Sequence, residues 1–182
     1  MKSLSHYRAK LHDRGFREII LGRLRWYKRS FAMDNWVVGR LVELFGNRIS
    51  LDGITLSLAN PLIPTPYKSN IYFGIYENGE RELSAKYLNR NIPTVEIGGS
   101  IGGVSCTVSK LLKDPASYVV VECSPENLLT LTKNRDLNQC SFAIEPKALA
   151  YGSDTISFNL ENFIAGRVNG NSVGKVWSQR QH

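Results

Sequence analysis

A glycine-rich turn between an apolar strand pattern and a helical pattern is the feature that most constrains the fold of this chain. From Val95 to Gly103 the sequence is VEIGGSIGG. Small residues at such a turn let a ligand approach the backbone closely, and the N–H groups at the start of the next helix favour an anionic group there. In open parallel sheets, ligands bind in the crevice at the carboxyl ends of the strands. We therefore expect a binding site at this turn.

From residue 93 onward, the hydrophobic periodicity alternates between that of a strand and that of a helix. Ser124 is a typical N-cap residue, and Pro125 suits the first turn of the helix that follows it. Such alternation is typical of right-handed crossovers in a parallel sheet, so we predict an α/β fold. The predicted strands are 94–97, 118–122, 142–148 and 155–160, and the predicted helices are 102–113 and 125–138.

The chain before residue 93 has a different pattern. The pair Asp52-Gly53 lies between two alternating segments, 49–51 and 54–58, which is a strong β-hairpin signal. Beyond residue 160 the sequence is rich in Gly and Asn, which predicts a loop or a frayed tail. We also expect helices at 35–45 and 80–88 and a strand at 71–76. The predicted division is a basic helical segment (1–48), a hairpin with a strand and a lead-in helix (49–92), a cofactor-binding half (93–160) and an irregular tail (161–182).

The excess of positive over negative charge is confined to the start of the chain. Residues 1–50 contain 11 Lys and Arg against 4 Asp and Glu, a net charge of +7, whereas residues 51–182 contain 12 of each. Apolar residues between 4 and 27 fall at roughly helical spacing among the basic ones. A helix that packs on its own domain is the simplest interpretation. An anionic membrane surface contacted through residues 1–30 is the alternative, and no motif favours nucleic acid.

The composition of the 182 residues, with 42% apolar side chains, indicates one globular domain. Its three cysteines include no C-x-x-C pair and it has only three histidines, so neither a disulfide framework nor a metal site is expected. No apolar run reaches the roughly 20 residues needed to span a bilayer, and no signal peptide is recognisable. We therefore expect a cytoplasmic protein, with peripheral membrane association as an option.

Two acids flank the glycine turn. Glu122 ends the second predicted strand, 24 residues after Gly98, and a carboxylate there can accept hydrogen bonds from ribose hydroxyls. A dinucleotide fingerprint needs glycine where this chain has Ser100, and Glu96 would repel a pyrophosphate. An acid suits a cationic ligand without phosphate, such as S-adenosylmethionine, better than a nicotinamide cofactor.

The chain resembles the FkbM-type S-adenosylmethionine-dependent methyltransferases over about residues 71–160. Their first motif is similar to V-D-V-G-A-N-x-G, their second strand ends in an acid before a P-E-N-like stretch, and a later N-x-x-L-N pattern matches residues 134–138. The resemblance implies a class I Rossmann-like fold with parallel strands in the order 3-2-1. It also implies that Glu96 orients the methionine amino group and Glu122 the ribose. The cofactor-binding residues so implied are Glu96, Gly98, Gly99, Ser100, Gly102, Glu122 and Asn127.

The family's fourth strand, with its D-x-L-K-x-D-x-E-G stretch, has no counterpart in this sequence. The predicted first strand, 94–97, would then have an unpaired edge that invites self-association. A chain truncated before strand 4 is the favoured explanation, ahead of a partner chain or a covering N-terminal strand. The expected activity is O-methylation of a sugar, glycan or small metabolite, with no catalytic base identifiable. The alternatives are a non-catalytic nucleotide-binding or interaction remnant, and then a nicotinamide oxidoreductase.

Overall fold

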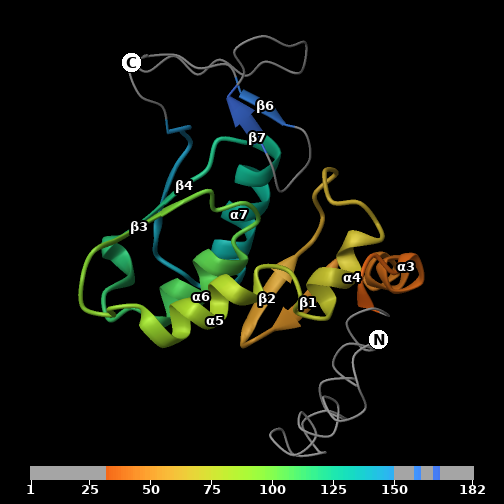
Figure 1. The fold of residues 1–182 in the computed structure, drawn as a ribbon, viewed down its shortest axis with the longest axis horizontal. Helices are drawn as coiled ribbons and strands as arrows, with labels where there is room; N and C mark the ends of the chain where they lie inside the picture. Colours follow the sequence, from red (N-terminus) through yellow and green to blue (C-terminus); the bar gives the residue numbers. More distant parts are fainter. Residues whose placement is uncertain (1–31, 150–157, 161–165, 169–182) are drawn as a thin grey trace, which may run out of the picture.

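The molecule is a mixed α/β structure in which a three-strand parallel sheet lies at one side and packs against helices (Figure 1). The computed structural model describes residues 32–149, 158–160 and 166–168. The strand order is β3-β4-β5, and each neighbouring pair is parallel. The predicted alternation of strands and helices is therefore confirmed within 93–145, although the third strand is shorter than expected. The strands are β3 (Thr94–Ile97), β4 (Tyr118–Val121) and β5 (Ala143–Glu145).

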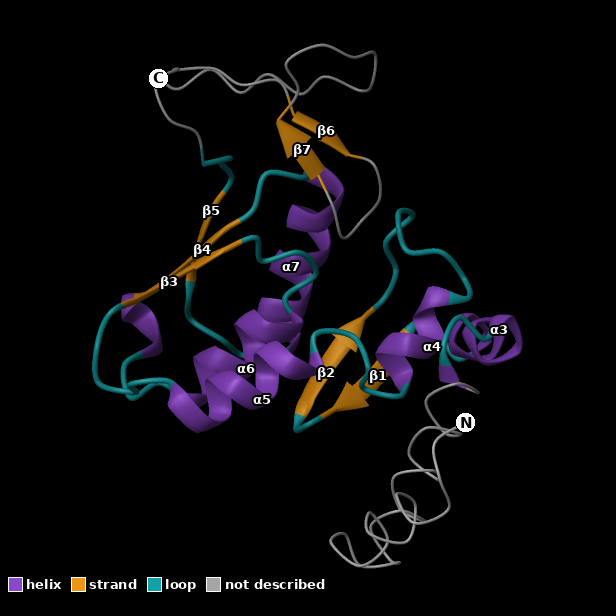
Figure 2. Cartoon of the chain, in the orientation of Figure 1, coloured by secondary structure: helices purple, strands orange, loops and turns teal. Residues whose placement is uncertain are grey.

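Both connecting helices, α6 (Gly103–Leu111) and α7 (Pro125–Leu137), lie on the same side of this sheet (Figure 2). When successive right-handed crossover connections proceed across a parallel sheet in the same direction, their helices lie on the same face of that sheet. The side chains of Tyr118 and Val120 are fully buried beneath them. On the opposite face, Val95 and Ile97 are 65% and 62% exposed. In the described part of the chain no strand pairs with the outer edge of β3.

A β-hairpin packs on the far side of the helices, as predicted from its Asp-Gly turn. Its strands are β1 (Arg48–Leu51) and β2 (Ile54–Ser57), paired antiparallel. Asp52 and Gly53 have φ values of 49° and 79°, and two consecutive positive values are what a two-residue type I′ turn requires. The hydrophobic core is continuous from this hairpin through α6 and α7 to the sheet.

Two asparagines of α7 pair with the backbone of β2 along the strand edge that faces the helix. Asn138 accepts from the N–H of Thr55 (2.8 Å) and donates to its carbonyl (2.7 Å). Asn134, one helical turn earlier, does the same with Ser57 (2.7 and 3.2 Å) and also donates to the carbonyl of Ile101 (2.8 Å). Residues i and i+4 of a helix thus meet alternate residues of a strand, which satisfies buried backbone groups that β1 does not reach.

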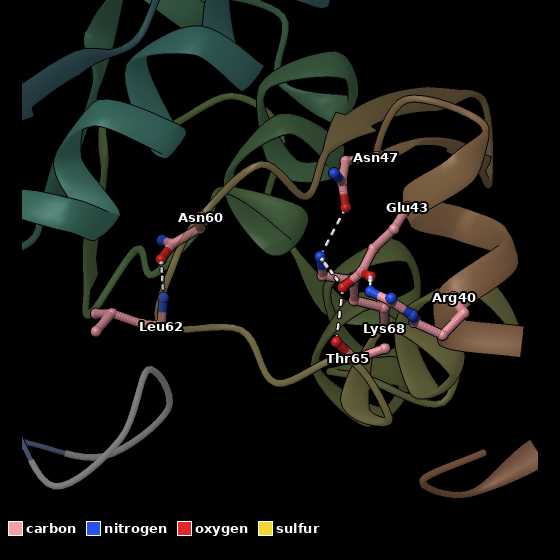
Figure 3. Close-up of polar contacts among 7 residues, drawn as sticks. All are labelled: Arg40, Glu43, Asn47, Asn60, Leu62, Thr65 and Lys68. Atoms are coloured by element: carbon pink, nitrogen blue, oxygen red, sulfur yellow. Dashed lines mark hydrogen bonds and ion pairs between the residues drawn. The ribbon is translucent and has the colours of Figure 1, made fainter. Parts of the chain in front are cut away.

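The helix α3 (Trp36–Leu44) precedes the hairpin and packs against α4 (Tyr67–Tyr72). Lys68 is buried between them, where its ammonium group lies 2.9 Å from the Glu43 carboxylate and 2.7 Å from the side-chain oxygen of Asn47 (Figure 3). Glu43 also accepts from Thr65 (2.7 Å). These hydrogen bonds, from Thr65 first, then Lys68 and Arg40, lower the pKa of Glu43 to about 2.

The predicted strand at 71–76 is wrong, because α4 occupies the first part of it. Pro66 starts the helix with a φ of −59°, and the helix ends before Gly74, whose φ is 69°. Ile71 is fully buried and belongs to the hydrophobic core. Packing of the helix against α3 and β1 outweighs the strand preference of the aromatic and β-branched residues in this segment.

The next helix, α5 (Asn78–Tyr87), confirms the prediction at 80–88 and is fixed by a buried arginine. Arg81 is 3% exposed and donates to the carbonyl groups of Tyr76 and Gly74. Its guanidinium group also pairs with Asp52 at 3.2 Å. The turn that precedes α5 is therefore tied to the tip of the hairpin.

Beyond the parallel sheet, β6 (Phe158–Leu160) pairs antiparallel with β7 (Gly166–Val168). The expectation of an irregular tail is thus wrong for residues 166–168, and β6 belongs to a separate two-strand sheet rather than to the parallel one. The predicted N-terminal helix lies outside the described residues. Among the helices that the structure describes, none is long and apolar enough to cross a bilayer.

We expect Asn134→Ala to lower the free energy of unfolding by about 3 kcal/mol or more. The substitution leaves both backbone groups of Ser57 and the carbonyl of Ile101 without this partner, and each unsatisfied buried group costs about 1–3 kcal/mol. Asn91 is exposed, so Asn91→Ala is the matched control and should change stability by less than about 0.5 kcal/mol. Equal denaturation midpoints for the two variants would contradict the proposed role of Asn134.

Candidate functional site

The glycine loop lies at the carboxyl end of β3, where the topology predicted a binding site. The N–H groups of Gly98 and Gly99 both donate to the carbonyl of Val121 at the end of β4 (2.8 and 3.1 Å). The N–H of Gly102 donates back to Gly99 (2.8 Å) as α6 begins. The loop is thus bonded to the neighbouring strand and to itself.

Two glycines of this loop have different physical roles. Gly98 has a φ of 86°, and a β-carbon built there would meet nothing within 4 Å, so its backbone faces open space that a ligand could approach. Gly99 is required for packing instead, because its β-carbon would lie 2.3 Å from Cγ1 of Val120 and 3.2 Å from Cδ2 of Leu131. Gly102, with a φ of 88°, would in the same way place a β-carbon 2.8 Å from Leu131.

Glu122 points into the loop, as the prediction of convergence at the carboxyl ends of adjacent strands required. Its Oε2 accepts from the N–H of Ser100 (2.8 Å), and its Oε1 accepts from the N–H groups of Cys123 (2.9 Å) and Ser124 (2.8 Å). The side chain is 7% exposed. Because a carboxylate oxygen has two lone pairs, Oε2 retains one acceptor position. Glu122 therefore organises the loop and has capacity for one further donor.

Ser100 connects this carboxylate to a tyrosine upstream of the sheet. Its φ is 47°, a left-handed conformation that is uncommon for a residue with a side chain. The Tyr76 hydroxyl donates to its Oγ at 2.9 Å, and both side chains are buried. Since the Ser100 N–H already donates to Glu122, it is not directed at a phosphate group.

Glu96 lies on the covered face of the sheet. It is half-buried and accepts a hydrogen bond from the Tyr118 hydroxyl of β4. Burial raises the pKa of Glu96 above its ordinary value, the hydrogen bond from Tyr118 acts in the opposite direction, and the negative charge of Glu122 raises it further. Among the described residues, neither Glu96 nor Glu122 forms a salt bridge with a lysine or arginine.

Glu77 is a third carboxyl group at the loop, and it was not among the residues that the sequence predicted for the site. It is mostly buried, with a φ of 50°, and its Oε2 lies 3.1 Å from where a β-carbon of Gly103 would be. Among the described residues, that oxygen has no hydrogen-bond partner within normal geometry. Burial raises the pKa of Glu77 to about 7; a hydrogen bond with Tyr76 acts in the opposite direction, and the charge of Glu96 raises the pKa further. Its place in a Tyr-Glu pair directly before a helix was the available signal.

Asn127 is placed differently from the other predicted site residues. It is 3% exposed in the first turn of α7, and its side-chain oxygen accepts from Asn60 at 3.0 Å. Asn60 also donates to the carbonyl of Glu126 (3.3 Å). Its side-chain oxygen accepts from the N–H of Leu62 (2.8 Å; Figure 3). Asn127 therefore fixes the segment after the hairpin to α7, and a role for it at a cofactor stays a prediction.

The chemistry of the loop favours a cation over a phosphate. Glu77, Glu96 and Glu122 lie near enough for the charge of Glu96 to affect Glu77 and that of Glu122 to affect Glu96. A positive ligand group would relieve this repulsion, whereas a phosphate would add to it. The N–H groups of Gly98, Gly99, Ser100 and Gly102 all donate within the protein.

The comparisons with known proteins do not assign this site. No protein-family model matches the chain, and no curated protein matches it.

We expect Gly99→Ala to lower the free energy of unfolding by about 1–3 kcal/mol, because the added methyl group would overlap Val120 in the core. Gly79→Ala is the matched control, since a β-carbon at that helical position meets nothing within 4 Å. It should leave stability unchanged or raise it by up to about 1 kcal/mol. Urea denaturation of both variants tests this, and equal losses would show that Gly99 is not packed as described.

Glu77→Gln should remove part of the pH dependence of stability. The folded-state pKa of about 7 is above the ordinary value of 4.5, so the folded protein binds the proton more tightly, and stability falls as pH rises from about 4.5 to 7. The variant should match the wild type near pH 4 and exceed it by roughly 3 kcal/mol at pH 8. Glu96, whose pKa is also raised, leaves a smaller slope in the same direction.

Denaturation at the two pH values measures this difference. Glu80→Gln, at an exposed neighbouring acid, is the control and should keep the wild-type slope. A wild-type slope in Glu77→Gln would mean that the carboxyl is solvated.

Proposed function

We propose that this chain is the cofactor-binding part of an S-adenosylmethionine-dependent methyltransferase with a Rossmann-like fold, similar to the FkbM type. The observation that supports it best is the loop from Gly98 to Gly102, which is surrounded by carboxyl groups and whose N–H groups at four positions are used internally. S-adenosylmethionine fits such a site because it has an ammonium and a sulfonium group and no phosphate. The parallel β3-β4-β5 order agrees with this fold.

In this proposal, the residues around the glycine loop bind different parts of S-adenosylmethionine. Glu96 and Glu77 provide negative charge for an ammonium group, and the buried Oε2 of Glu77 is an acceptor to which no group of the described residues donates. Gly98 offers backbone that a ligand can contact closely. The remaining acceptor position on Oε2 of Glu122 suits one ribose hydroxyl. When bound, S-adenosylmethionine supplies an electrophilic methyl group, and these residues hold and orient it.

The acceptor in this proposal is a hydroxyl of a sugar or small metabolite, and the protein's contribution to rate is positioning. A second candidate function is a non-catalytic half-domain that binds a nucleoside or another protein. The open edge of β3 and the exposed Val95 and Ile97 favour it, because they are the features of a sheet that another element completes.

Calorimetric titration with S-adenosylmethionine and, separately, NAD tests the cofactor assignment. We expect S-adenosylmethionine to bind and Gly98→Ala to weaken its binding by about tenfold or more, because the methyl group would enter the space that the ligand approaches. Gly46→Ala is a matched control, because Gly46 also has a positive φ (84°) and no atom within 4 Å of its β-carbon position. Both variants should lose about 1–2 kcal/mol of stability from backbone strain, but only Gly98→Ala should lose binding.

Binding of NAD alone would overturn the assignment. Binding of S-adenosylmethionine that Gly98→Ala and Gly46→Ala affect equally would place the cofactor elsewhere on the chain. Binding of neither compound would favour the non-catalytic half-domain.

A further inference from the structure

The outward face of α3 is apolar, which is the reverse of what a surface helix normally shows. Leu44 and Phe45 are both 80% exposed, and Trp36, Val37 and Leu41 are exposed as well. At 100° per residue these positions fall on one side of the helix, while the buried Gly39 and Val42 fall on the other. We call this outward set, together with Met33, the α3 stripe.

The rotation of α3 is fixed, so the α3 stripe cannot turn inward. A β-carbon on Gly39 would lie 1.8 Å from the carbonyl oxygen of Thr65, which shows that the helix backbone is in direct contact with the segment before α4. Glu43 on the inward side is bonded to Thr65 and Lys68 (Figure 3). At the start of the helix, the Asn35 side chain accepts from the N–H of Val38 (3.2 Å). The exposure of the stripe is therefore a property of this packing.

The stripe has a basic residue within it and a basic sequence before it. Arg40 lies within the outward face, with its guanidinium 5.4 Å from the centre of the Trp36 ring and 2.7 Å from the Glu43 carboxylate. Residues 1–31, which lead directly into α3, contain nine Lys and Arg against two Asp and Glu. Tryptophan, arginine and large aliphatic side chains on one face beside a basic segment are the composition of a helix that binds at a membrane interface.

From this combination we infer that the α3 stripe is a docking surface for an anionic lipid bilayer, to which the basic sequence of residues 1–31 adds positive charge. The stripe inserts its apolar side chains at the level of the headgroups. The cations contact anionic lipids, and each one close to the surface adds favourable electrostatic free energy of binding. A second copy of the chain is a poorer occupant, because two such surfaces would bring their positive charges together. In Figure 1, α3 lies at the margin of the molecule opposite the β3-β4 sheet, so a bilayer there leaves the glycine loop accessible.

Flotation of the full chain with phosphatidylcholine vesicles, with and without phosphatidylglycerol, tests this inference. We expect binding to the anionic vesicles that weakens at high salt, and little binding to the neutral ones. Leu44→Ser combined with Phe45→Ser should lower the partition coefficient by about tenfold or more. Leu83→Ser with Tyr87→Ser on α5 is the matched control, since those side chains are 58% and 68% exposed, and it should bind as the wild type does.

Circular dichroism of both variants tests whether they are folded. We expect both to fold, because the substituted side chains are exposed. Failure of the wild type to float with anionic vesicles would overturn the inference. So would equal binding by the α3 variant and the wild type. Sedimentation of the wild type as a dimer that the α3 variant abolishes, without vesicle binding, would assign the stripe to a second copy instead.

Discussion

The side-chain amide of Asn134 is the contact on which the arrangement of this molecule depends. It pairs with both backbone groups of Ser57 in the hairpin and donates to the carbonyl of Ile101 in the glycine loop, and it is fully buried. Hydrophobic packing alone would hold the hairpin against α7, but it would not define the register of a strand against a helix. Directional hydrogen bonds to alternate strand residues do so, because a shift by one residue would leave several buried groups unpaired. The position of the loop relative to the hairpin follows from the same side chain.

The site itself is held by backbone hydrogen bonds to a carboxylate rather than by ion pairs. Glu122 accepts hydrogen bonds from three backbone N–H groups of two different segments, and its side chain is 7% exposed. Burial raises the pKa of Glu77, although a hydrogen bond with Tyr76 and the positive charge of Arg81 act in the opposite direction. The two acids thus differ in their surroundings, because Glu122 is held by three backbone N–H groups and burial raises the pKa of Glu77 to about 7. That difference is a common property of binding sites and is independent of which ligand is bound.

Local signals in the sequence were sufficient for much of the fold. The Asp52-Gly53 turn predicted the hairpin, and the Ser124-Pro125 start predicted α7, because in both cases the backbone conformation is set by the residues themselves. The segment 71–76 was wrongly predicted as a strand, since its helical beginning depends on packing against α3 and β1. Parallel topology also brought Glu122 to the glycine loop as predicted. Burial of Glu77 could not be foreseen, because Arg81 ties the turn to the hairpin through Asp52, which is distant in the sequence.

The one-sided coverage of the parallel sheet limits how the sheet could be extended. The chain runs across the sheet from β3 through β4 to β5, so a further parallel strand on the other side of β3 would require the chain to return in the opposite direction. A right-handed connection to that strand would place its helix on the exposed face, over Val95 and Ile97. A single strand-and-helix unit would thus close the open edge and cover the exposed apolar face together. The reversal of winding would fall beside the loop at Gly98, where open α/β sheets form their deepest clefts. The same strand and helix that complete the sheet would then also form a wall of the pocket beside Gly98.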